Sequence, residues 1–232
     1  MLKQHLQLSD LALTLANKKA ISLAGNGKKI VEALGASIKV YRQLNIPNEK
    51  IDISRIFITS RKKLHEQAMV ELYRLFSSYM SNIIAEIEHK HPKRFLGILS
   101  NNVDRSIHYS DIIRIGNFSS LIDEMADRVF RTLDNKRSTN DLLKAIIKCT
   151  RITIEDEIKN TALAYLEIRH LIIHNDAKAD AKFLNMPKCN VVSINRKTQK
   201  ISLNFKVTNE AINAIFRLCK TIDDNLIAKD LV

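Results

Sequence analysis

The stretch Glu167-Ile168-Arg169-His170-Leu171-Ile172-Ile173-His174-Asn175-Asp176 ends the most strongly amphipathic segment of the chain. The spacing of apolar residues predicts a helix from about Thr153, a plausible N-cap, to Asn175, where Asn-Asp is a stop signal. Arg169 falls within the apolar face, whereas His170 and His174 lie on the other side. That apolar face gathers, at about 100° per residue, Ile154, Ile158, Ala162, Tyr165, Leu166, Ile172 and Ile173.

Arg169 is the unusual residue of this helix, because a guanidinium that points toward a core is costly unless a carboxylate or a phosphate meets it. One interpretation is a structural ion pair with an acidic residue of a neighbouring helix, for which Glu71 is a candidate. The other is a functional site that Arg169 shares with His174. By itself, His174 could equally be a solvated histidine near a helix C-terminus, where a cation is favoured.

The combination Arg169-His170-x-x-x-His174 resembles the R-polar-x3-H signature of the HEPN superfamily, all-α domains that include many metal-independent endoribonucleases. The resemblance covers roughly residues 61–232 and includes a long amphipathic helix upstream, the helix that carries the motif, and a short hairpin and helix after it. It implies an all-α, HEPN-like helical bundle with a small β-hairpin near the C-terminus. It also implies a composite site at a homodimer interface and RNA products that end in 2′,3′-cyclic phosphate and 5′-hydroxyl.

The residue types fit RNA cleavage without a metal, in which the 2′-hydroxyl of the substrate is the nucleophile. Histidine, with an unperturbed pKa near 6.5, can transfer either proton at neutral pH, and arginine offers a charged fork that matches phosphate oxygens. Arg169 and His174 are therefore the predicted catalytic residues, and His170 is expected to position phosphate or orient His174. Five residues on a regular helix span about 140° and roughly 7.5 Å, so Arg169 and His174 share a face only if the helix loosens near His174.

Residues just after the motif, Asn175, Lys178 and Lys182, are predicted to contact RNA. If no cleavage occurs, these lysines together with Arg196 and Lys197 would form a non-catalytic RNA-binding module. A further alternative is a DNA-binding regulator or scaffold that uses the basic N-terminal helices, where 9 Lys+Arg stand against 4 Asp+Glu through residue 60.

No metal site and no cofactor are expected from the sequence. His170 and His174 have the H-x-x-x-H spacing of a zinc-protease helix, but Leu171 stands where that site needs a glutamate. The three cysteines, Cys149, Cys189 and Cys219, are far apart in the sequence. We therefore interpret them as small buried side chains of a protein in a reducing cytoplasm.

Composition bounds the class of protein. Over 232 residues, 45% hydrophobic and 27% charged residues are ordinary for a globular protein, and only 5 Gly and 3 Pro favour long helices. The formal net charge of +12 favours a nucleic-acid partner. No run of about 18 apolar residues occurs, so no membrane span is expected, and the first residues lack the pattern of a signal peptide.

The predicted organisation is a basic N-terminal helical segment over residues 1–55 and a HEPN-like domain over residues 56–232. The longest helix is expected from Arg61 to Lys90. Residues 191–194 and 201–207 alternate with period two around a polar turn, which predicts a hairpin. Thr208 would then cap a last helix whose inner face includes Phe216.

The resemblance further implies a toxin or an antiviral, abortive-infection defence effector, with an antitoxin or a defence-system protein as a candidate partner. In HEPN toxins that are silenced by nucleotide transfer, a tyrosine follows the motif histidine by two places. Asp176 stands there in this chain, so that form of control is not expected. Many relatives also carry a glycine shortly after the histidine, where this chain has Ala177.

Overall fold

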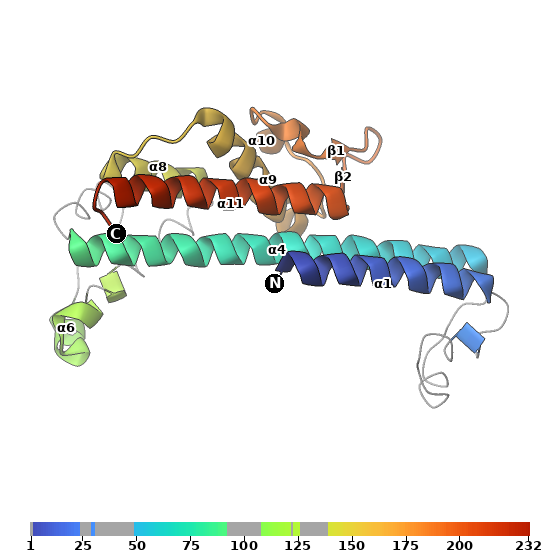
Figure 1. The fold of residues 1–232 in the computed structure, drawn as a ribbon, viewed down its shortest axis with the longest axis horizontal. Coiled ribbons are helices and arrows are strands. Elements are labelled where there is room, and N and C mark those ends of the chain that lie inside the picture. Colours follow the sequence, from blue (N-terminus) through green and yellow to red (C-terminus); the bar gives the residue numbers. More distant parts are fainter. Residues whose placement is uncertain (1, 24–28, 31–48, 92–107, 122, 126–138) are drawn as a thin grey trace.

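The computed structural model describes residues 2–23, 29–30, 49–91, 108–121, 123–125 and 139–232. These residues form a bundle of helices with one small antiparallel hairpin near the C-terminus, which confirms the predicted all-α class (Figure 1). Within this part of the chain, no helix has both the length and the apolar character needed to cross a membrane. The elements in chain order are α1 (Leu2–Ser22), α4 (Lys50–Lys90), α6 (Tyr109–Ile115), α8 (Thr139–Thr150), α9 (Asp156–His174), α10 (Ala181–Leu184), the 3-10 helix η1 (Cys189–Val191), β1 (Ser193–Ile194), β2 (Ile201–Ser202) and α11 (Phe205–Ala228).

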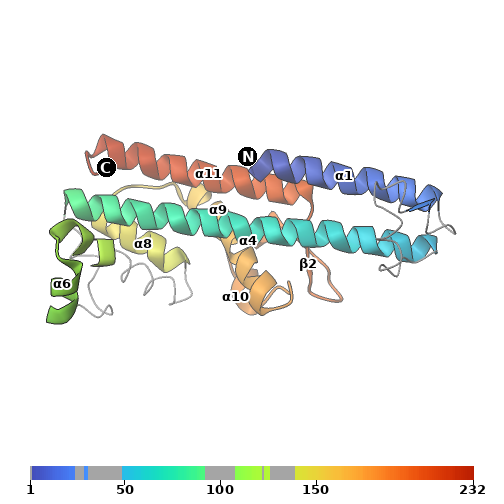
Figure 2. The same cartoon turned by 90° about the horizontal axis from the view of Figure 1, so that it is seen from below.

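The 41-residue helix α4 organises the molecule, with a length of about 60 Å at 1.5 Å per residue. Helix α1 lies antiparallel along its N-terminal half, and α9 and α11 pack along its C-terminal half (Figures 1 and 2). The predicted start at Arg61 is wrong, because residues 50–60 contain no glycine or proline and continue the helix, with Ile53 buried against Ala20 of α1. The helix also runs through residue 55, where the predicted N-terminal segment ends, and the division into two units stays a prediction.

The main core lies where α4, α8, α9 and α11 meet. Helix α9 is buried along most of its length, with Ala162 and Ala164 fully covered, and their small side chains allow neighbouring helices to approach closely. The largest fully buried side chains of this core are Met69, Met80, Ile84, Ile87, Leu143, Ile146, Ile168, Leu171, Phe183 and Leu218.

Helix α9 begins at Asp156, three residues later than predicted, and Glu155 occupies the N-cap position without a capping side-chain hydrogen bond. The residues before it are irregular, with Ile152 and Ile154 buried and Thr153 between them exposed. The predicted N-cap at Thr153 is therefore wrong, because the two isoleucines are buried in the core by a non-helical segment.

Helix α11 begins at Phe205, so the strand predicted to reach residue 207 ends at Ser202. The strand ends there because Asn204 caps helix α11: its side chain accepts a hydrogen bond from the Val207 amide at 3.0 Å. The period-two alternation of the sequence over residues 201–207 gave no sign of this cap. The hairpin itself is confirmed, with Ser193 opposite Ser202 and Ile194 opposite Ile201.

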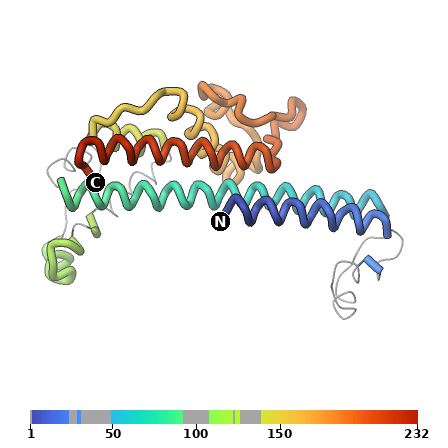
Figure 3. The backbone as a smooth tube through the Cα atoms, viewed as in Figure 1, coloured from blue at the N-terminus to red at the C-terminus, as the bar shows by residue number. Residues whose placement is uncertain are grey.

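A polar network ties α1 to α4 and α11, which come together near the N-terminus of α1 (Figure 3). Arg61 donates from Nε and Nη2 to both carboxylate oxygens of Asp10, at 2.7 and 2.9 Å. His65, only 1% exposed, has Nε2 at 3.3 Å from Asp10 Oδ1 and Nδ1 at 3.2 Å from Thr208 Oγ1. The hydrogen bond from Arg61 lowers the pKa of Asp10, and burial lowers the pKa of His65.

Acidification is expected to destabilise this network, and His65 should respond first. Both pKa values are lower in the folded state, so each group contributes stability above its ordinary pKa, and that stability is lost as pH falls below about 6.5 for His65 and 3.8 for Asp10. Urea unfolding at about pH 7.5 and about pH 5.5 should show a smaller loss of stability for His65→Gln than for the wild type. Equal losses in both proteins would contradict a contribution from His65.

Candidate functional site at the end of helix α9

Helix α9 keeps its regular course through His174. The amide of Asn175 still donates to the carbonyl of Leu171 at 3.1 Å, and the amide of Ala177 donates to the same oxygen at 2.9 Å. The chain then turns through Asp176 and Ala177, which have left-handed φ values of 50° and 56°. The loosening that would place Arg169 and His174 on one face of α9 is therefore not found.

The hairpin fixes the turn that follows His174. The amide of Ile201 donates to the Ala177 carbonyl at 2.9 Å, and Lys200 pairs with Asp176 at 2.9 Å. The side-chain amide of Asn175, a predicted RNA contact, donates to the Lys178 carbonyl at 2.8 Å. Asn175 thus has a structural role in this turn, which holds the end of α9 in a defined position.

Arg169 is half-buried and lies over an aromatic ring of α4, with Cζ at 4.7 Å from the centroid of Tyr73. Its Nε atom is buried and has no hydrogen-bond partner, and no carboxylate of the described residues forms an ion pair with it. The predicted partner Glu71 is wrong, because Glu71 accepts two hydrogen bonds from Arg74, at 2.9 and 2.6 Å. The cation–π contact with Tyr73 compensates only part of the cost of desolvating the guanidinium.

The two histidines of the motif contact each other, and the regular helix places them about 100° and 140° around α9 from Arg169. Their ring centroids are 4.8 Å apart with the planes tilted by 43°, His174 is exposed and His170 is half-buried. This pair places two imidazole rings at the surface of the helix end. The structure therefore brings His170 and His174 together, and it leaves Arg169 on a different face.

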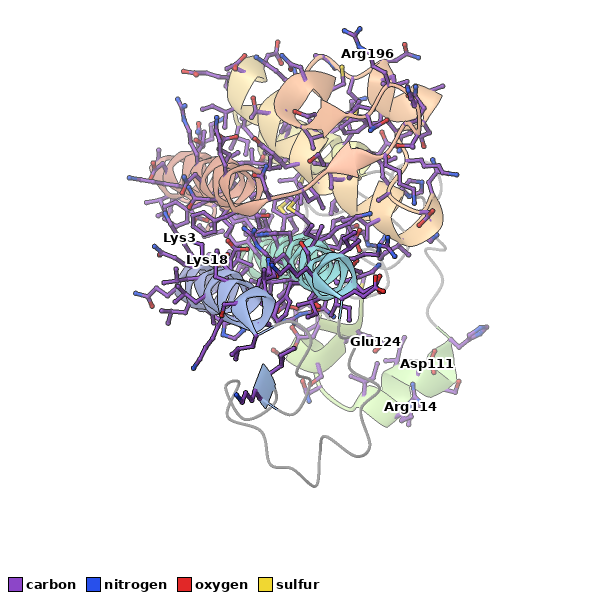
Figure 4. All side chains as sticks on the ribbon, turned by 90° about the vertical axis from the view of Figure 1, so that its right-hand side faces the viewer. Lys3, Lys18, Asp111, Arg114, Glu124 and Arg196 are labelled. Carbon is purple, nitrogen blue, oxygen red and sulfur yellow. The ribbon has the colours of Figure 1, made fainter. Side chains whose placement is uncertain are left out.

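The predicted basic residues lie in different settings. Lys182 is paired with Glu167 at 2.7 Å, which partly neutralises it, whereas the side chain of Lys178 is exposed beside the turn. Arg196 and Lys197 lie at the tip of the hairpin, and Figure 4 shows Arg196 pointing away from the bundle. Lys3 and Lys18 extend from α1, on the opposite side of α4 from the hairpin (Figure 4).

Sequence reasoning missed Tyr73, because no spacing rule relates a residue of α4 to one of α9 across the bundle. It also missed Lys200, which links the hairpin to the turn after His174. No protein-family model matches the chain, and neither a curated protein nor a solved structure matches it.

Proposed function

We propose that the protein is a metal-independent endoribonuclease whose catalytic residues are Arg169 and His174. The observation that carries this proposal is the environment of Arg169, a half-buried guanidinium whose Nε has no partner and which no described carboxylate neutralises. A structural arginine at such a depth is expected to have an acidic partner. The absence of one among the described residues supports binding of an external anion, for which an RNA phosphate fits the guanidinium.

The chemistry needs two proton transfers and charge stabilisation. A neutral histidine removes the proton of the 2′-hydroxyl, and the 2′ oxygen forms a bond to phosphorus while the bond from phosphorus to the 5′ oxygen breaks. A protonated histidine gives its proton to the leaving 5′ oxygen, and Arg169 stabilises the charge on the phosphate oxygens. The products are a 2′,3′-cyclic phosphate and a 5′-hydroxyl, so both atoms and charge balance without a metal.

A homodimer that apposes two α9 ends would complete the site. In one chain Arg169 and His174 occupy different faces of a regular helix, so a single copy does not present both to one phosphate. Ile173, next to His174, is 46% exposed, which supports an apolar contact between two copies at this point. Two-fold symmetry would then supply an acid and a base on opposite sides of the phosphorus.

The backbone after the motif adds support for the HEPN resemblance. Ala177 has a left-handed φ of 56°, a conformation that glycine adopts most easily, and it stands near the place where many HEPN relatives carry a glycine. In context the enzyme would be a toxin or an antiviral defence effector of the cytoplasm, restrained by an antitoxin or a defence-system partner protein.

A second candidate function is RNA binding without cleavage. The separation of Arg169 from the histidine pair within one chain favours it, since a protein that stays monomeric would not assemble the site. Exposed Lys178, Arg196 and Lys197 would then supply backbone contacts.

The decisive experiment is cleavage of end-labelled RNA in excess chelator, with identification of the new ends. The wild type should leave cyclic phosphate, and Arg169→Ala should cut about 10²–10³-fold more slowly, because charge on phosphorus is no longer stabilised. Arg217→Ala, at an exposed position of α11, is the matched control and should cut normally. Products with 3′-hydroxyl ends, or full activity of Arg169→Ala, would refute the assignment, and binding without cleavage by a folded dimer would favour the second candidate.

A further inference from the structure

A pocket of about 380 Å³ lies between α4 and the segment that joins the hairpin to α11. The residues from α4 are Ile58, Arg61, Lys62 and His65, which occupy successive turns of one face. The opposite wall is formed by Asn195, Thr198, Lys200, Ile201, Ser202, Leu203 and Asn204. The pocket is thus separate from Arg169 and His174, although Lys200 connects it to the turn that follows His174.

The lining of this pocket is strongly biased toward cations. Arg61, Lys62 and Lys200 line it, each paired with a carboxylate from outside the lining, and no acidic side chain lines the pocket itself. Hydroxyl and amide groups that can donate hydrogen bonds accompany them. The N-terminus of the 24-residue helix α11, capped by Asn204, also borders the pocket and adds the positive end of its dipole.

Carboxylates that do not line the pocket pair with these cations. Asp10 fixes Arg61 through two hydrogen bonds, Glu66 lies 3.5 Å from Lys62, and Asp176 lies 2.9 Å from Lys200. Each cation therefore has a defined direction and loses less side-chain entropy when it meets a ligand. Because Arg and Lys retain several donors, each can still hydrogen-bond to an anion within the pocket.

We propose that this pocket binds the phosphate group of a nucleotide, either free or within an RNA strand. Three cations with neighbouring hydroxyl and amide donors match the several oxygens and the charge of a phosphate. The apolar side chain of Ile58, which is 62% exposed, offers a surface for a base or a sugar, next to the buried Ile201 and Leu203. The volume lies within the range of about 300–1,000 Å³ that is typical of small-molecule sites.

The test is isothermal titration of the full chain with AMP, with adenosine, and with a short 2′-O-methyl oligonucleotide that cannot be cut by 2′-hydroxyl attack. AMP should bind and adenosine should not, because the phosphate supplies the recognised charge. If the oligonucleotide competes with AMP, an RNA strand can supply the phosphate, and if it does not compete, the ligand is a free nucleotide. The measurement does not depend on cleavage, so its result is independent of the proposed nuclease activity.

Two variants and a matched control locate the binding. Lys200→Gln and Ser202→Asp should each weaken binding by about tenfold or more, the second by adding a negative charge while leaving every ion pair of the wall intact. Lys220→Gln removes an exposed cation of α11 that lies outside the pocket, and this variant should bind normally. The proposal would be overturned by equal weakening in all three variants, by equal binding of adenosine and AMP, or by no binding of AMP and oligonucleotide to the folded wild type.

Discussion

Replacement of His174 by alanine is expected to slow RNA cleavage by about 10²–10⁴-fold, the range found when a general acid or base is removed. The fold should be preserved, because His174 is exposed at the last position of α9, where its ring lies against that of His170. The free energy of unfolding should change by less than about 1 kcal/mol, the size of an interaction between a histidine and a helix C-terminus. A large loss of rate with an intact fold would assign a chemical role to His174.

The control for this prediction is His5→Ala, since His5 is an exposed histidine of α1. It should leave both the cleavage rate and the stability unchanged. Rates should be measured at equal protein concentration and with excess chelator, so that a change in dimerisation is seen separately by sedimentation. Cleavage by His174→Ala at the wild-type rate would show that the activity lies elsewhere, whatever the result for Arg169.

Truncation of Phe183 to alanine is expected to destabilise the protein by about 3–5 kcal/mol, the usual cost of removing a buried phenylalanine. Phe183 is 0% exposed and belongs to the main core, although it comes from the four-residue helix α10. The cap of α10, in which Asp180 accepts from the Phe183 amide at 2.8 Å, holds the ring in this position. Loss of the ring would leave a cavity beneath the segment that carries Lys178 and Lys182.

Phe216→Ala is the matched variant, because Phe216 is 68% exposed on α11. Its unfolding free energy should change by less than about 0.5 kcal/mol. Urea unfolding of the two variants measures the difference directly. A comparable destabilisation by both would mean that Phe216 is buried in solution, for example at a contact between copies.

The two phenylalanines also show what the sequence could predict. Helical periodicity located α9 and α11 but identified fewer than half of the residues buried in them, missing Ile168 and Leu171 of α9, and it placed the exposed Ile173 and Phe216 on inner faces. The buried stripe of α11 is formed by Ala211, Ile215, Leu218, Ile222 and Leu226, and Phe216 lies about 100° around the helix from Ile215. Phe183 could not be anticipated, because a single turn of helix has no periodicity from which its buried side can be identified.

For the candidate site too, the sequence predicted features that depend on neighbouring residues of the chain, but not contacts between different helices. The positions of Arg169, His170 and His174 along one helix, and the turn that follows, were readable from adjacent residues. The ring beneath Arg169 and the pairing of Glu71 with Arg74 depend on how α4 meets α9, which sequence spacing does not specify. Likewise, Lys62 and Lys200 are brought to one pocket only by the packing of the hairpin against α4.

Helix α4 is a continuous helix, but its two halves are packed against very different amounts of apolar surface. Its C-terminal half belongs to the large core, whereas its first turns, among the described residues, bury only Ile53, in a small cluster with Ala20 and Ile30, and leave Ile51 and Ile56 exposed. Local opening of a backbone requires the least free energy where few apolar groups are buried. The end that begins at Lys50 is therefore expected to fray and re-form within the native state more readily than the stretch around Tyr73 that contacts Arg169.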